Sequence, residues 1–316
     1  MKKINWGILG LASIALDEGI KAIENEPSSV FYALATNTQE EYHKAQKTLD
    51  MEKLYSDYEA LLSDDQVEAV YIPLPNALHK EWTLKALEKG KHVLCEKPLA
   101  LHEEEVLAMM AKAKENGCVL LEGFMYRYTP RMKKVQEVID RGVLGEIRHV
   151  ETSFRFMLED SEDVRMDPSL GGGAFYDVGT YGVNFMTSIF KKKPMSILAM
   201  KRMEKGVDVQ STVLLEYDDG ISGVIHSAFN SFEKNEAEII GTKGRLLILD
   251  PFLYNEGFIT LYVGKEKEEI PVAPCEDFQG EFQDVVMAIL AGREPKISMA
   301  ESLMNTQITD EILELF

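Results

Sequence analysis

The sequence has few cysteines, few basic residues and no long apolar segment. Its three cysteines, Cys95, Cys118 and Cys275, are widely spaced and form no CxxC or CxxH pair, so neither a disulfide framework nor a metal site is indicated. Acidic residues outnumber basic ones by 53 to 34, which argues against nucleic-acid binding, because a phosphate backbone requires clustered lysine and arginine. No stretch approaches the roughly 18 apolar residues of a membrane span, and the N-terminus lacks the pattern of a signal region. We therefore expect a soluble protein of the reducing cytoplasm.

The first third of the 316 residues alternates short apolar runs with amphipathic stretches. At roughly 150 residues per domain, this length predicts two domains. Alternating strand and helix patterns are typical of a parallel sheet, so we predict an α/β fold that begins with a doubly wound domain over residues 1–122. Its predicted strands are 4–9, 30–35, 69–72, 92–95 and 119–122, and its predicted helices are 14–24, 38–49, 57–62, 78–89 and 101–116.

Past Pro130 the pattern changes to strands joined by tight turns, such as Asp218-Asp219-Gly220 and Thr242-Lys243-Gly244. This arrangement predicts a mostly antiparallel sheet, and the helix after Gly173 is the candidate to cover one of its faces. We assign residues 123–316 to this second domain and expect its C-terminal helices to pack back on the first. The predicted strands are 147–156, 195–203, 207–217, 221–229, 236–241, 244–249 and 258–263, and the predicted helices are 131–141, 281–290 and 299–315.

Glu96-Lys97-Pro98 directly follows the apolar run 92–95 and places a lysine at the end of a buried strand. Proline restricts the residue before it to an extended conformation. In an open parallel sheet, ligands bind at the carboxyl ends of the strands. Alone, a lysine at a strand end is an ordinary surface residue. Together with two glycine-rich segments, it indicates a ligand site that includes Glu96 and Lys97.

A glycine turn follows the first strand. Gly10-Leu11-Ala12-Ser13-Ile14-Ala15 is a variant of G-x-G-x-x-G/A with alanine in place of the second glycine. Gly10 permits the tight turn, and the N–H groups at the start of the next helix favour a pyrophosphate. Ala12 adds a methyl group where backbone and phosphate approach each other, so the fit is looser. Because of its place in a doubly wound domain, the turn predicts a dinucleotide site formed by Gly10, Ala12, Ser13 and Ile14.

The end of the second strand predicts which dinucleotide is bound. At Ala35-Thr36-Asn37-Thr38 no Asp or Glu is present to accept hydrogen bonds from a ribose 2′-hydroxyl, as an NAD site prefers. The hydroxyl of Thr36 and the amide of Asn37 suit a 2′-phosphate, although the arginine typical of such sites is missing. We therefore favour NADP over NAD. The alternative, that Thr36 and Asn37 simply cap the next helix, stays open.

A rigid loop, Pro73-Leu74-Pro75-Asn76, follows the strand 69–72 and leads to His79. Two prolines around Leu74 hold the backbone extended at the same sheet edge as Lys97. Such a loop suits one wall of a nicotinamide pocket, and we include Pro73, Leu74, Asn76 and His79 among the cofactor-binding residues. A lone histidine at the start of a helix is more often a structural hydrogen-bonding residue than an acid–base catalyst.

The second glycine-rich segment is Gly171-Gly172-Gly173-Ala174-Phe175-Tyr176-Asp177-Val178-Gly179-Thr180-Tyr181. Its triple glycine lets the backbone pass close to a ligand or a neighbouring strand before a helix begins. On that helix Asp177 and Tyr181 stand at i and i+4, and hence on one face. A polar pair on a helix is usually a solvated face. The lysine and the dinucleotide turn elsewhere in the chain make a functional pair the better interpretation.

These motifs resemble the glucose-fructose oxidoreductase, inositol dehydrogenase and rhizopine-catabolism (Gfo/Idh/MocA) family. The similarity covers nearly the whole chain and rests on residues 7–15, 55–62, 67–79, 96–98, 122–130 and 171–181, in the family's order and spacing. It implies a Rossmann domain followed by an α/β domain whose large open sheet often mediates oligomerisation, and a homodimer is our default expectation. Tyr181, where many members have histidine, resembles the branch with dihydrodiol dehydrogenase and NADP-dependent xylose dehydrogenase, which supports NADP.

The resemblance also implies an activity, namely hydride transfer between NAD or NADP and a sugar, polyol or cyclic diol. By position, Lys97, Asp177 and Tyr181 form the catalytic group and contact the substrate together with Phe156, and we place Arg127 at the cofactor. Tyr181 exchanges the proton of the substrate hydroxyl. An unperturbed phenol, with a pKa of about 10, needs a nearby ammonium such as Lys97 to act as a base near neutral pH.

Asp177 would orient a second substrate hydroxyl, as suits a polyol. The same fold also serves non-catalytic dinucleotide-binding regulators, so a sensor without turnover is the alternative function.

Overall fold

The computed structural model describes residues 2–253 and 256–316. The chain divides into two compact units. Unit 1 comprises Met1–Met125 and Phe278–Leu303, and unit 2 comprises Tyr126–Asp277 and Met304–Phe316. The first division falls three residues past the expected boundary, and a C-terminal segment is grouped with unit 1.

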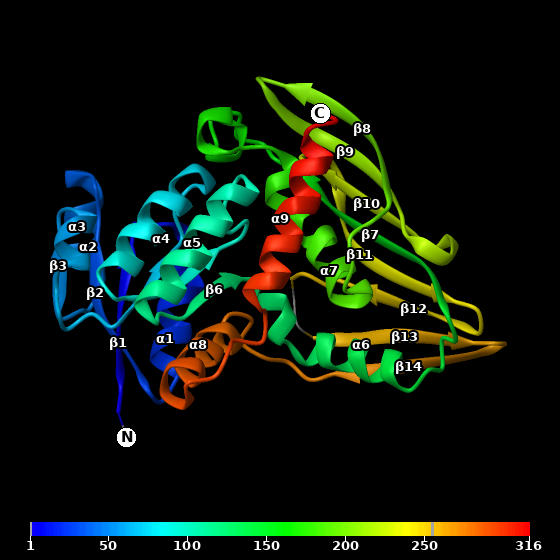
Figure 1. The fold of residues 1–316 in the computed structure, drawn as a ribbon, viewed down its shortest axis with the longest axis horizontal. Helices are drawn as coiled ribbons and strands as arrows, with labels where there is room; N and C mark the ends of the chain where they lie inside the picture. The colour runs from blue at the N-terminus through cyan, green and yellow to red at the C-terminus, as the bar shows by residue number, and fades with distance from the viewer. Residues whose placement is uncertain (1, 254–255) are drawn as a thin grey trace. The chain divides into compact units, whose positions relative to one another are not determined.

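Unit 1 contains a six-stranded parallel sheet in the order β3-β2-β1-β4-β5-β6 (Figure 1). The strand order reverses beside β1, which is the topological switch of a doubly wound Rossmann fold. The predicted fold class of the first domain is therefore confirmed. Its strands are β1 (Ile4–Leu9), β2 (Ser29–Ala35), β3 (Lys53–Tyr55), β4 (Ala69–Ile72), β5 (His92–Glu96) and β6 (Leu120–Gly123), and its helices are η1 (Ala15–Gly19), α1 (Ile20–Asn25), α2 (Gln39–Thr48), α3 (Tyr58–Leu62), η2 (Asn76–Leu78), α4 (His79–Glu88), α5 (Glu103–Asn116) and α8 (Gln279–Ala291).

The core of unit 1 lies on both faces of this sheet. All four residues of β4 are buried, as expected for a parallel strand covered by helices on both sides. Helix α8, which comes late in the chain, is part of this core. The ring of Phe282 packs edge-on against Trp6 and Tyr71, with centroid distances of 5.0 and 5.1 Å.

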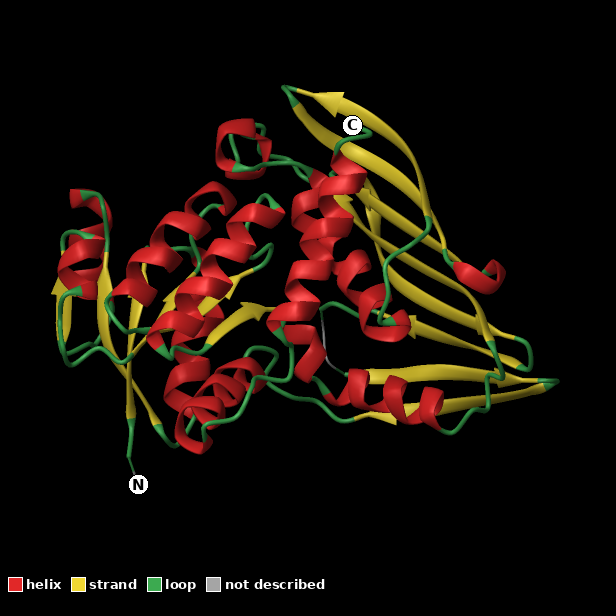
Figure 2. Cartoon of the chain, in the orientation of Figure 1, coloured by secondary structure: helices red, strands yellow, loops and turns green. Residues whose placement is uncertain are grey.

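Unit 2 contains an eight-stranded sheet in the order β14-β13-β12-β11-β7-β10-β9-β8. Its neighbouring strands are antiparallel except for the parallel pair β7 and β10, so the predicted mostly antiparallel sheet is confirmed. Figure 2 shows this sheet in yellow. Its strands are β7 (Ile147–Met157), β8 (Ser196–Glu204), β9 (Val207–Glu216), β10 (Ser222–Ala228), β11 (Asn230–Gly241), β12 (Gly244–Leu249), β13 (Gly257–Val263) and β14 (Glu266–Val272), and its helices are η3 (Met125–Tyr128), α6 (Pro130–Asp140), η4 (Val164–Met166), η5 (Pro168–Leu170), η6 (Phe175–Gly179), α7 (Thr180–Phe190) and η7 (Asp218–Gly220). The last helix, α9 (Met299–Leu313), begins in unit 1 and ends in unit 2.

Helix α7 covers one face of the eight-stranded sheet, as predicted. A side chain at Gly182 would place its Cβ 2.6 Å from Oγ1 of Thr152 on β7 and 2.7 Å from Cγ2 of Ile225 on β10, so this helix packs closely on the two central strands. On β8 and β9 the opposite face carries exposed apolar side chains. Leu198 is 65% exposed and its cross-strand partner Leu214 is 43% exposed.

Two strands were not predicted, and two helix starts differ from a plain α-helix. Strand β3 has only three residues, and β14 is an edge strand whose first four residues are charged and exposed, so neither has the apolar pattern of a strand. Helices η1 and η6 are π-turns that lead into α1 and α7. The sequence pattern predicted continuous α-helices there, because a single wide turn leaves the apolar spacing almost unchanged.

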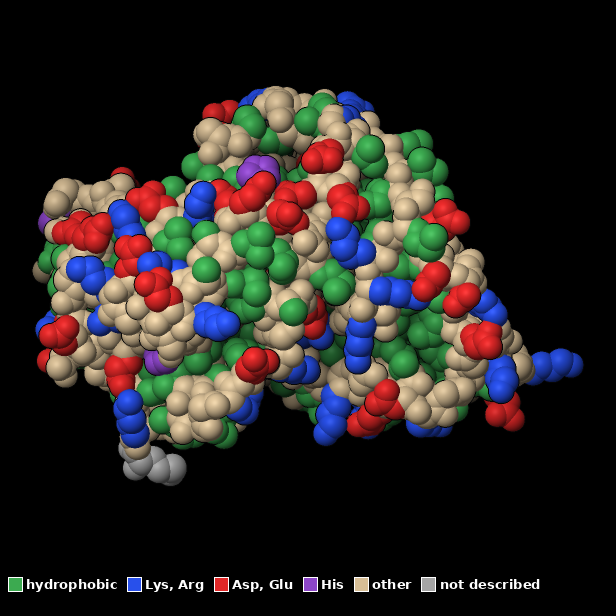
Figure 3. Space-filling model, in the orientation of Figure 1, with side chains coloured by type: hydrophobic (Ala, Val, Ile, Leu, Met, Phe, Trp, Pro, Cys, Tyr) green, Lys and Arg blue, Asp and Glu red, His purple; other side chains and the backbone are tan. Residues whose placement is uncertain are grey.

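Acidic and basic side chains are interspersed over the face of the molecule in Figure 3, where red and blue groups alternate. Such mixing gives no clustered basic surface on that face for a phosphate backbone. Within residues 2–253 and 256–316, no helix combines the length and the apolar character that crossing a membrane requires.

Candidate functional site

The turn after β1 adopts the conformation that its glycine permits. Gly10 has φ +93°, which side-chain-bearing residues rarely adopt, and an added Cβ would lie 2.9 Å from Cδ2 of Leu74. The turn leads to Ala12 and Ile14, which are half-buried, and to Ser13, which is exposed. The helix start after β1 therefore presents its N–H groups at the carboxyl end of the central strand, where a pyrophosphate binds in this fold.

Thr38 caps α2, and the alternative that Thr36 or Asn37 caps it is wrong. The backbone N–H of Glu41 donates to Oγ1 of Thr38 at 3.2 Å. Thr36 is buried, and its hydroxyl lies 3.4 Å from the carbonyl oxygen of Thr38. Asn37 is exposed at the carboxyl end of β2. Its amide is therefore accessible to a ligand at the position that discriminates between the two dinucleotides.

His79 joins two loops at the sheet edge of unit 1. It is fully buried, with Nε2 2.7 Å from the carbonyl oxygen of Leu74 and Nδ1 2.8 Å from that of Pro98. Burial lowers its pKa and favours the neutral imidazole, which donates to only one of these carbonyls. Along the first loop Pro73 is buried and Asn76 is half-buried. Both ring nitrogens of His79 thus face the protein. The residue can influence a ligand only by positioning the two loops that it joins.

The segment that carries Lys97 is fixed by hydrogen bonds on both sides. The phenol of Tyr71 donates to Oε1 of Glu96 at 2.6 Å. On the other side, the backbone N–H of Leu99 donates to Oε1 of Glu122 at 2.9 Å. The peptide bond after Lys97 is cis. Lys97 therefore follows β5 on a backbone that is held at the residues before and after it.

A buried carboxyl group of α8 lies under this segment. Glu281 is fully buried, and among the described residues neither of its carboxyl oxygens has a hydrogen-bond partner. An added Cβ on Gly123 would lie 3.6 Å from its Oε2. Burial and the nearby charge of Glu96 raise the pKa of Glu281 well above its usual value, which favours the protonated form of this carboxyl group.

In unit 2, Asp208 fixes the start of the helix after the triple glycine. Its Oδ2 accepts a hydrogen bond from the backbone N–H of Phe175 at 2.9 Å. Gly173 has φ +125°, and an added Cβ would lie 2.4 Å from Oδ1 of Asp208, so only glycine fits. The N–H of Thr180 bonds to the carbonyl of Phe175 and closes the π-turn. π-turns of this kind occur frequently at functional sites.

Asp208 should make the stability of unit 2 depend on pH. Burial raises the pKa of this carboxyl group to about 6 from 3.8, despite the hydrogen bond from Phe175. Because the native state then binds the proton more tightly than the unfolded state, the contribution of Asp208 to the free energy of unfolding is greatest below about pH 4 and is lost as the pH rises through about 6. Asp208→Asn keeps an acceptor oxygen and does not titrate. Between pH 4 and pH 7 it should gain on the order of 3 kcal/mol relative to the wild type.

Urea unfolding of both proteins at pH 4, 5, 6 and 7 measures this difference. Asp219→Asn, at an exposed carboxylate on the turn between β9 and β10, is the matched control and should follow the wild type. Parallel pH curves for Asp208→Asn and the wild type would contradict the assignment.

Asp177 lies beside Arg165. Nε of Arg165 donates to Oδ2 of Asp177 at 2.9 Å. Nη1 of the same guanidinium lies 3.0 Å from Oδ2 of Asp163. The charge of Asp177 is the main cause that raises the pKa of Arg165. The loop 157–165, which follows β7, therefore ends in a charged contact with a predicted site residue.

Tyr181 sits in an aromatic cluster of unit 2. Its ring centroid lies 5.2 Å from Phe252, 5.6 Å from Phe154 and 5.8 Å from Tyr126. The side chain is 8% exposed, whereas Phe252 is 1% exposed. Such packing restricts the ring of Tyr181 to one orientation. Phe156, the predicted substrate contact, packs instead against Phe229, with a centroid distance of 5.2 Å.

Arg127 is anchored to α7. The amide oxygen of the buried residue Asn184 accepts hydrogen bonds from Nη1 of Arg127 at 3.1 Å and from the phenol of Tyr126 at 2.6 Å. Asn184 stands three residues after Tyr181, so it lies on the same face of α7. This bond fixes the orientation of the guanidinium that we placed at the cofactor.

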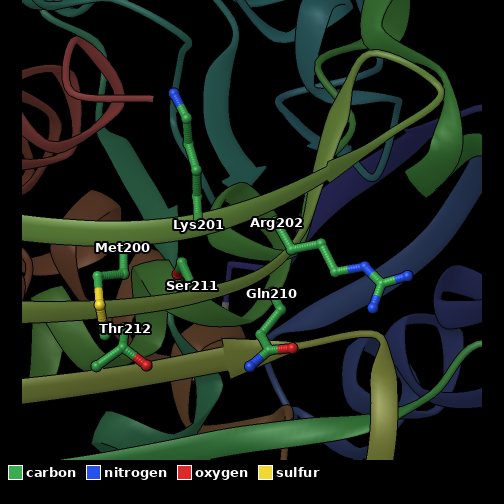
Figure 4. A pocket seen from close by; sticks show the side chains of 6 residues that line it. All are labelled: Met200, Lys201, Arg202, Gln210, Ser211 and Thr212. Carbon is green, nitrogen blue, oxygen red and sulfur yellow. The ribbon is translucent and has the colours of Figure 1, made fainter.

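A shallow pocket on strands β8 and β9 contains none of the predicted site residues. Figure 4 shows its six lining side chains, Met200, Lys201, Arg202, Gln210, Ser211 and Thr212. Lys201 points to the opposite side of the sheet from Met200, as alternation along a strand requires. Across the part of the chain that the structure describes, no group of three or more His, Cys, Asp or Glu side chains is arranged to hold a metal ion.

Comparison with known protein families shows which family the two units match. Residues 4–124 match the model of an oxidoreductase family with an NAD-binding Rossmann fold, and residues 132–247 match the model of the GFO/IDH/MocA C-terminal domain. The chain belongs to the Gfo/Idh/MocA family. The predicted family is thus confirmed, and the protein is an oxidoreductase with an NAD(P)-binding Rossmann domain.

This Gfo/Idh/MocA protein is similar over most of its length to curated enzymes. It is 32% identical over 317 residues to a D-xylose 1-dehydrogenase (NADP(+)) 2 of Haloferax volcanii, with coverage of 98% of the chain and 96% of the relative. It is 35% identical over 275 residues to a trans-1,2-dihydrobenzene-1,2-diol dehydrogenase of Mus musculus, with coverage of 85% and 80%. Among solved structures, a 3-ketoreductase from Actinomadura kijaniata in complex with NADP and TDP-benzene has a TM-score of 0.92 at 29% identity, with coverage of 99% and 98%.

The sequence of this Gfo/Idh/MocA protein did not indicate several side chains that contact the predicted site residues. Asp208, Arg165 and Phe252 contact the segment 173–181 from other parts of unit 2. Each stands in an unremarkable local pattern. The triple glycine indicated only that the backbone passes close to a ligand or a neighbouring strand.

Proposed function

We propose that the protein is an NADP-dependent dehydrogenase or reductase acting on the CH–OH group of a sugar, polyol or cyclic diol. The observation that carries the proposal is that Lys97, Asp177 and Tyr181 all occur in a chain that matches a sugar dehydrogenase and a 3-ketoreductase over 98% and 99% of its length. No single structural role explains Lys97 at the end of β5 together with Asp177 and Tyr181 on one helix face. Hydride transfer gives them a common role.

The residues of unit 1 fit a dinucleotide. The positive φ of Gly10 opens the turn, and Ala12, Ser13 and Ile14 follow it at the helix start. We propose that these residues hold the pyrophosphate. Thr36 and the exposed Asn37 would receive the adenosine ribose and its 2′-phosphate, which favours NADP over NAD. The wall beside the nicotinamide would be formed or supported by Pro73, Leu74, Asn76, His79 and Glu96. We also keep Arg127 among the proposed cofactor-binding residues.

The protein's side chains supply the proton chemistry. When bound, the nicotinamide gives or takes the hydride. Tyr181 exchanges the proton of the substrate hydroxyl, and the ammonium of Lys97 stabilises the phenolate form. Asp177 accepts a hydrogen bond from a second hydroxyl of the substrate and orients it, and Phe156 contributes an apolar contact. Because side chains of the protein hold the substrate and transfer the proton, each of these roles can be tested by a single substitution.

We further propose that the protein is a homodimer of the cytoplasm. The open face of the eight-stranded sheet supports the dimer, because Leu198, Met200 and Leu214 expose apolar side chains on neighbouring strands. Cys95, Cys118 and Cys275 are all free thiols, which suits a reducing compartment. Sedimentation velocity at micromolar concentration tests the assembly, and a monomer at all concentrations would contradict it.

A thermal-shift titration with NADP(H) and NAD(H), followed by a nicotinamide absorbance assay, tests the function. A ligand that binds only the native state must raise the melting temperature, and NADP(H) should do so by several degrees at about a hundredfold excess over Kd. The absorbance assay then runs over aldoses, inositols and cyclic diols, and turnover of at least one is expected. A melting-temperature shift without turnover would favour the non-catalytic sensor, and no shift with either dinucleotide would overturn the proposal.

A further inference from the structure

Arg165 is held between two carboxylates in a fixed orientation. Its Nε donates to Oδ2 of Asp177 at 2.9 Å, and its Nη1 lies 3.3 and 3.0 Å from the two carboxyl oxygens of Asp163. Asp163 also accepts a hydrogen bond from the backbone N–H of Arg165 at 2.8 Å. A planar guanidinium bound on two edges cannot rotate freely, so the direction of its remaining N–H groups is set.

The triple glycine positions the backbone of Arg165. The N–H of Gly173 donates to the carbonyl oxygen of Arg165 at 2.9 Å, and the N–H of Gly172 donates to that of Asp167 at 3.0 Å. A Cβ on Gly172 would lie 2.5 Å from the oxygen of Arg165 and 2.8 Å from that of Asp167. Both are backbone atoms, so no side-chain movement relieves the clash. The glycines therefore allow the segment around Arg165 to lie against the start of the helix that carries Asp177.

The pair presents a donor and an acceptor side by side to solvent. Among the described residues, no protein group accepts from Nη2 of Arg165, which carries two further N–H groups. The carboxylate of Asp177 can accept several hydrogen bonds, and its Oδ2 accepts the one from Nε of Arg165. The side chains of Arg165 and Asp177 are 44% and 21% exposed, so a small molecule can reach both.

We propose that Arg165 is a specificity-determining residue that, with Asp177, selects substrates with a hydroxyl on the carbon next to the reacting one. That hydroxyl donates its proton to Asp177 and accepts from Nη2 of Arg165, so it satisfies both groups at once. A methylene at this carbon would offer no acceptor to Nη2 of Arg165 and no proton to Asp177. The inference rests on the proposed function, because it takes Tyr181, four residues after Asp177, as the group at the reacting oxygen.

Matched substrate pairs test this inference. The pairs are trans-cyclohexane-1,2-diol with cyclohexanol, and D-glucose with 2-deoxy-D-glucose. The wild type should prefer the member with the neighbouring hydroxyl in kcat/KM. In Arg165→Met, kcat/KM for that member should fall about 10- to 100-fold, as expected for a lost hydrogen bond to a charged group, whereas kcat/KM for the other member should change less than about threefold.

Two further variants separate charge, geometry and general damage. Arg165→Lys keeps the charge but lacks the planar fork, so its preference should be intermediate. Arg202→Met removes an exposed arginine paired with Glu204 on β8 and should match the wild type on all four compounds. The rise in melting temperature with NADP should be unchanged in every variant, which shows that the fold and the dinucleotide site are intact.

The outcomes separate this inference from the proposed function. Equal losses on both members of a pair in Arg165→Met, or no loss on either, would contradict the role of Arg165 while leaving the dehydrogenase intact. Wild-type protein that binds NADP and turns over no aldose, inositol or cyclic diol of the full panel would contradict both. A collapse of the preference in Arg165→Met, with NADP binding retained, is the result we expect.

Discussion

Replacing Tyr181 with phenylalanine should lower kcat by about 10²- to 10⁴-fold, the usual contribution of a positioned acid–base group. Phenylalanine keeps the ring that packs against Phe252 at 5.2 Å and removes only the hydroxyl. The NADP-induced rise in melting temperature should therefore be unchanged, and the loss should appear in kcat. Lys97→Met should cause a loss of similar size, because the phenolate then lacks its ammonium partner.

The two substitutions should not be additive. If Lys97 and Tyr181 act as one unit, the double variant should be little worse than either single variant. Tyr262→Phe on β13 and Lys112→Met on α5 are matched controls, because both side chains lie on partly exposed surfaces and pair with Arg245 and Glu115. Single-turnover absorbance measurements separate the chemical step from product release. A kcat within threefold of the wild type in both Tyr181→Phe and Lys97→Met would rule out the mechanism.

Local sequence rules predicted the backbone features of the candidate site. Gly10 and Gly173 have positive φ and sit where a side chain would clash, so their positions follow from the turns alone. The strand before Lys97 could be predicted because it is apolar and Pro98 follows shortly after it. The Rossmann order of strands followed from alternating strand and helix patterns, since parallel neighbours require crossover helices.

Contacts between segments that are far apart in the sequence could not be predicted. Asp208 bonds to Phe175 across 33 residues, and nothing near either residue marks the pairing. The capping residue of α2 was missed by one or two positions, because Thr36, Asn37 and Thr38 all have side chains that suit a cap and only the backbone selects Thr38. The ionisation of Glu281 depends on burial under the sheet, which a helix pattern does not report.

Arg131→Met should destabilise unit 2 by about 3 to 5 kcal/mol, because each hydrogen bond to a charged group contributes about 1.5 to 3 kcal/mol and such bonds are not fully additive. Arg131 is 2% exposed on α6. Its guanidinium donates to the carbonyl oxygen of Asp250, to that of Leu253 at 3.1 Å and to that of Glu256 at 2.6 Å. Methionine fills a similar volume but leaves all three carbonyls without this donor.

The measurement must follow unit 2 separately. Trp6 and Trp82 are the only tryptophans in the chain and both belong to unit 1, so fluorescence reports that unit, whereas hydrogen exchange along residues 126–277 reports the other. Exchange should rise in unit 2 of Arg131→Met and stay constant in unit 1. Arg148→Met, at an exposed arginine on β7, should change stability by less than about 0.5 kcal/mol.

The same substitution should affect Tyr181, the proposed acid–base residue, through Phe252. This side chain lies in the segment that Arg131 holds at Asp250 and Leu253, and its ring packs on Tyr181 at 5.2 Å and on Phe154 at 5.7 Å. When this segment is less tightly held, Phe252 no longer fixes the ring of Tyr181. We therefore expect kcat to fall by about tenfold even at temperatures where the variant is fully folded. Full activity in a destabilised Arg131→Met would show that the arginine stabilises unit 2 without positioning Tyr181.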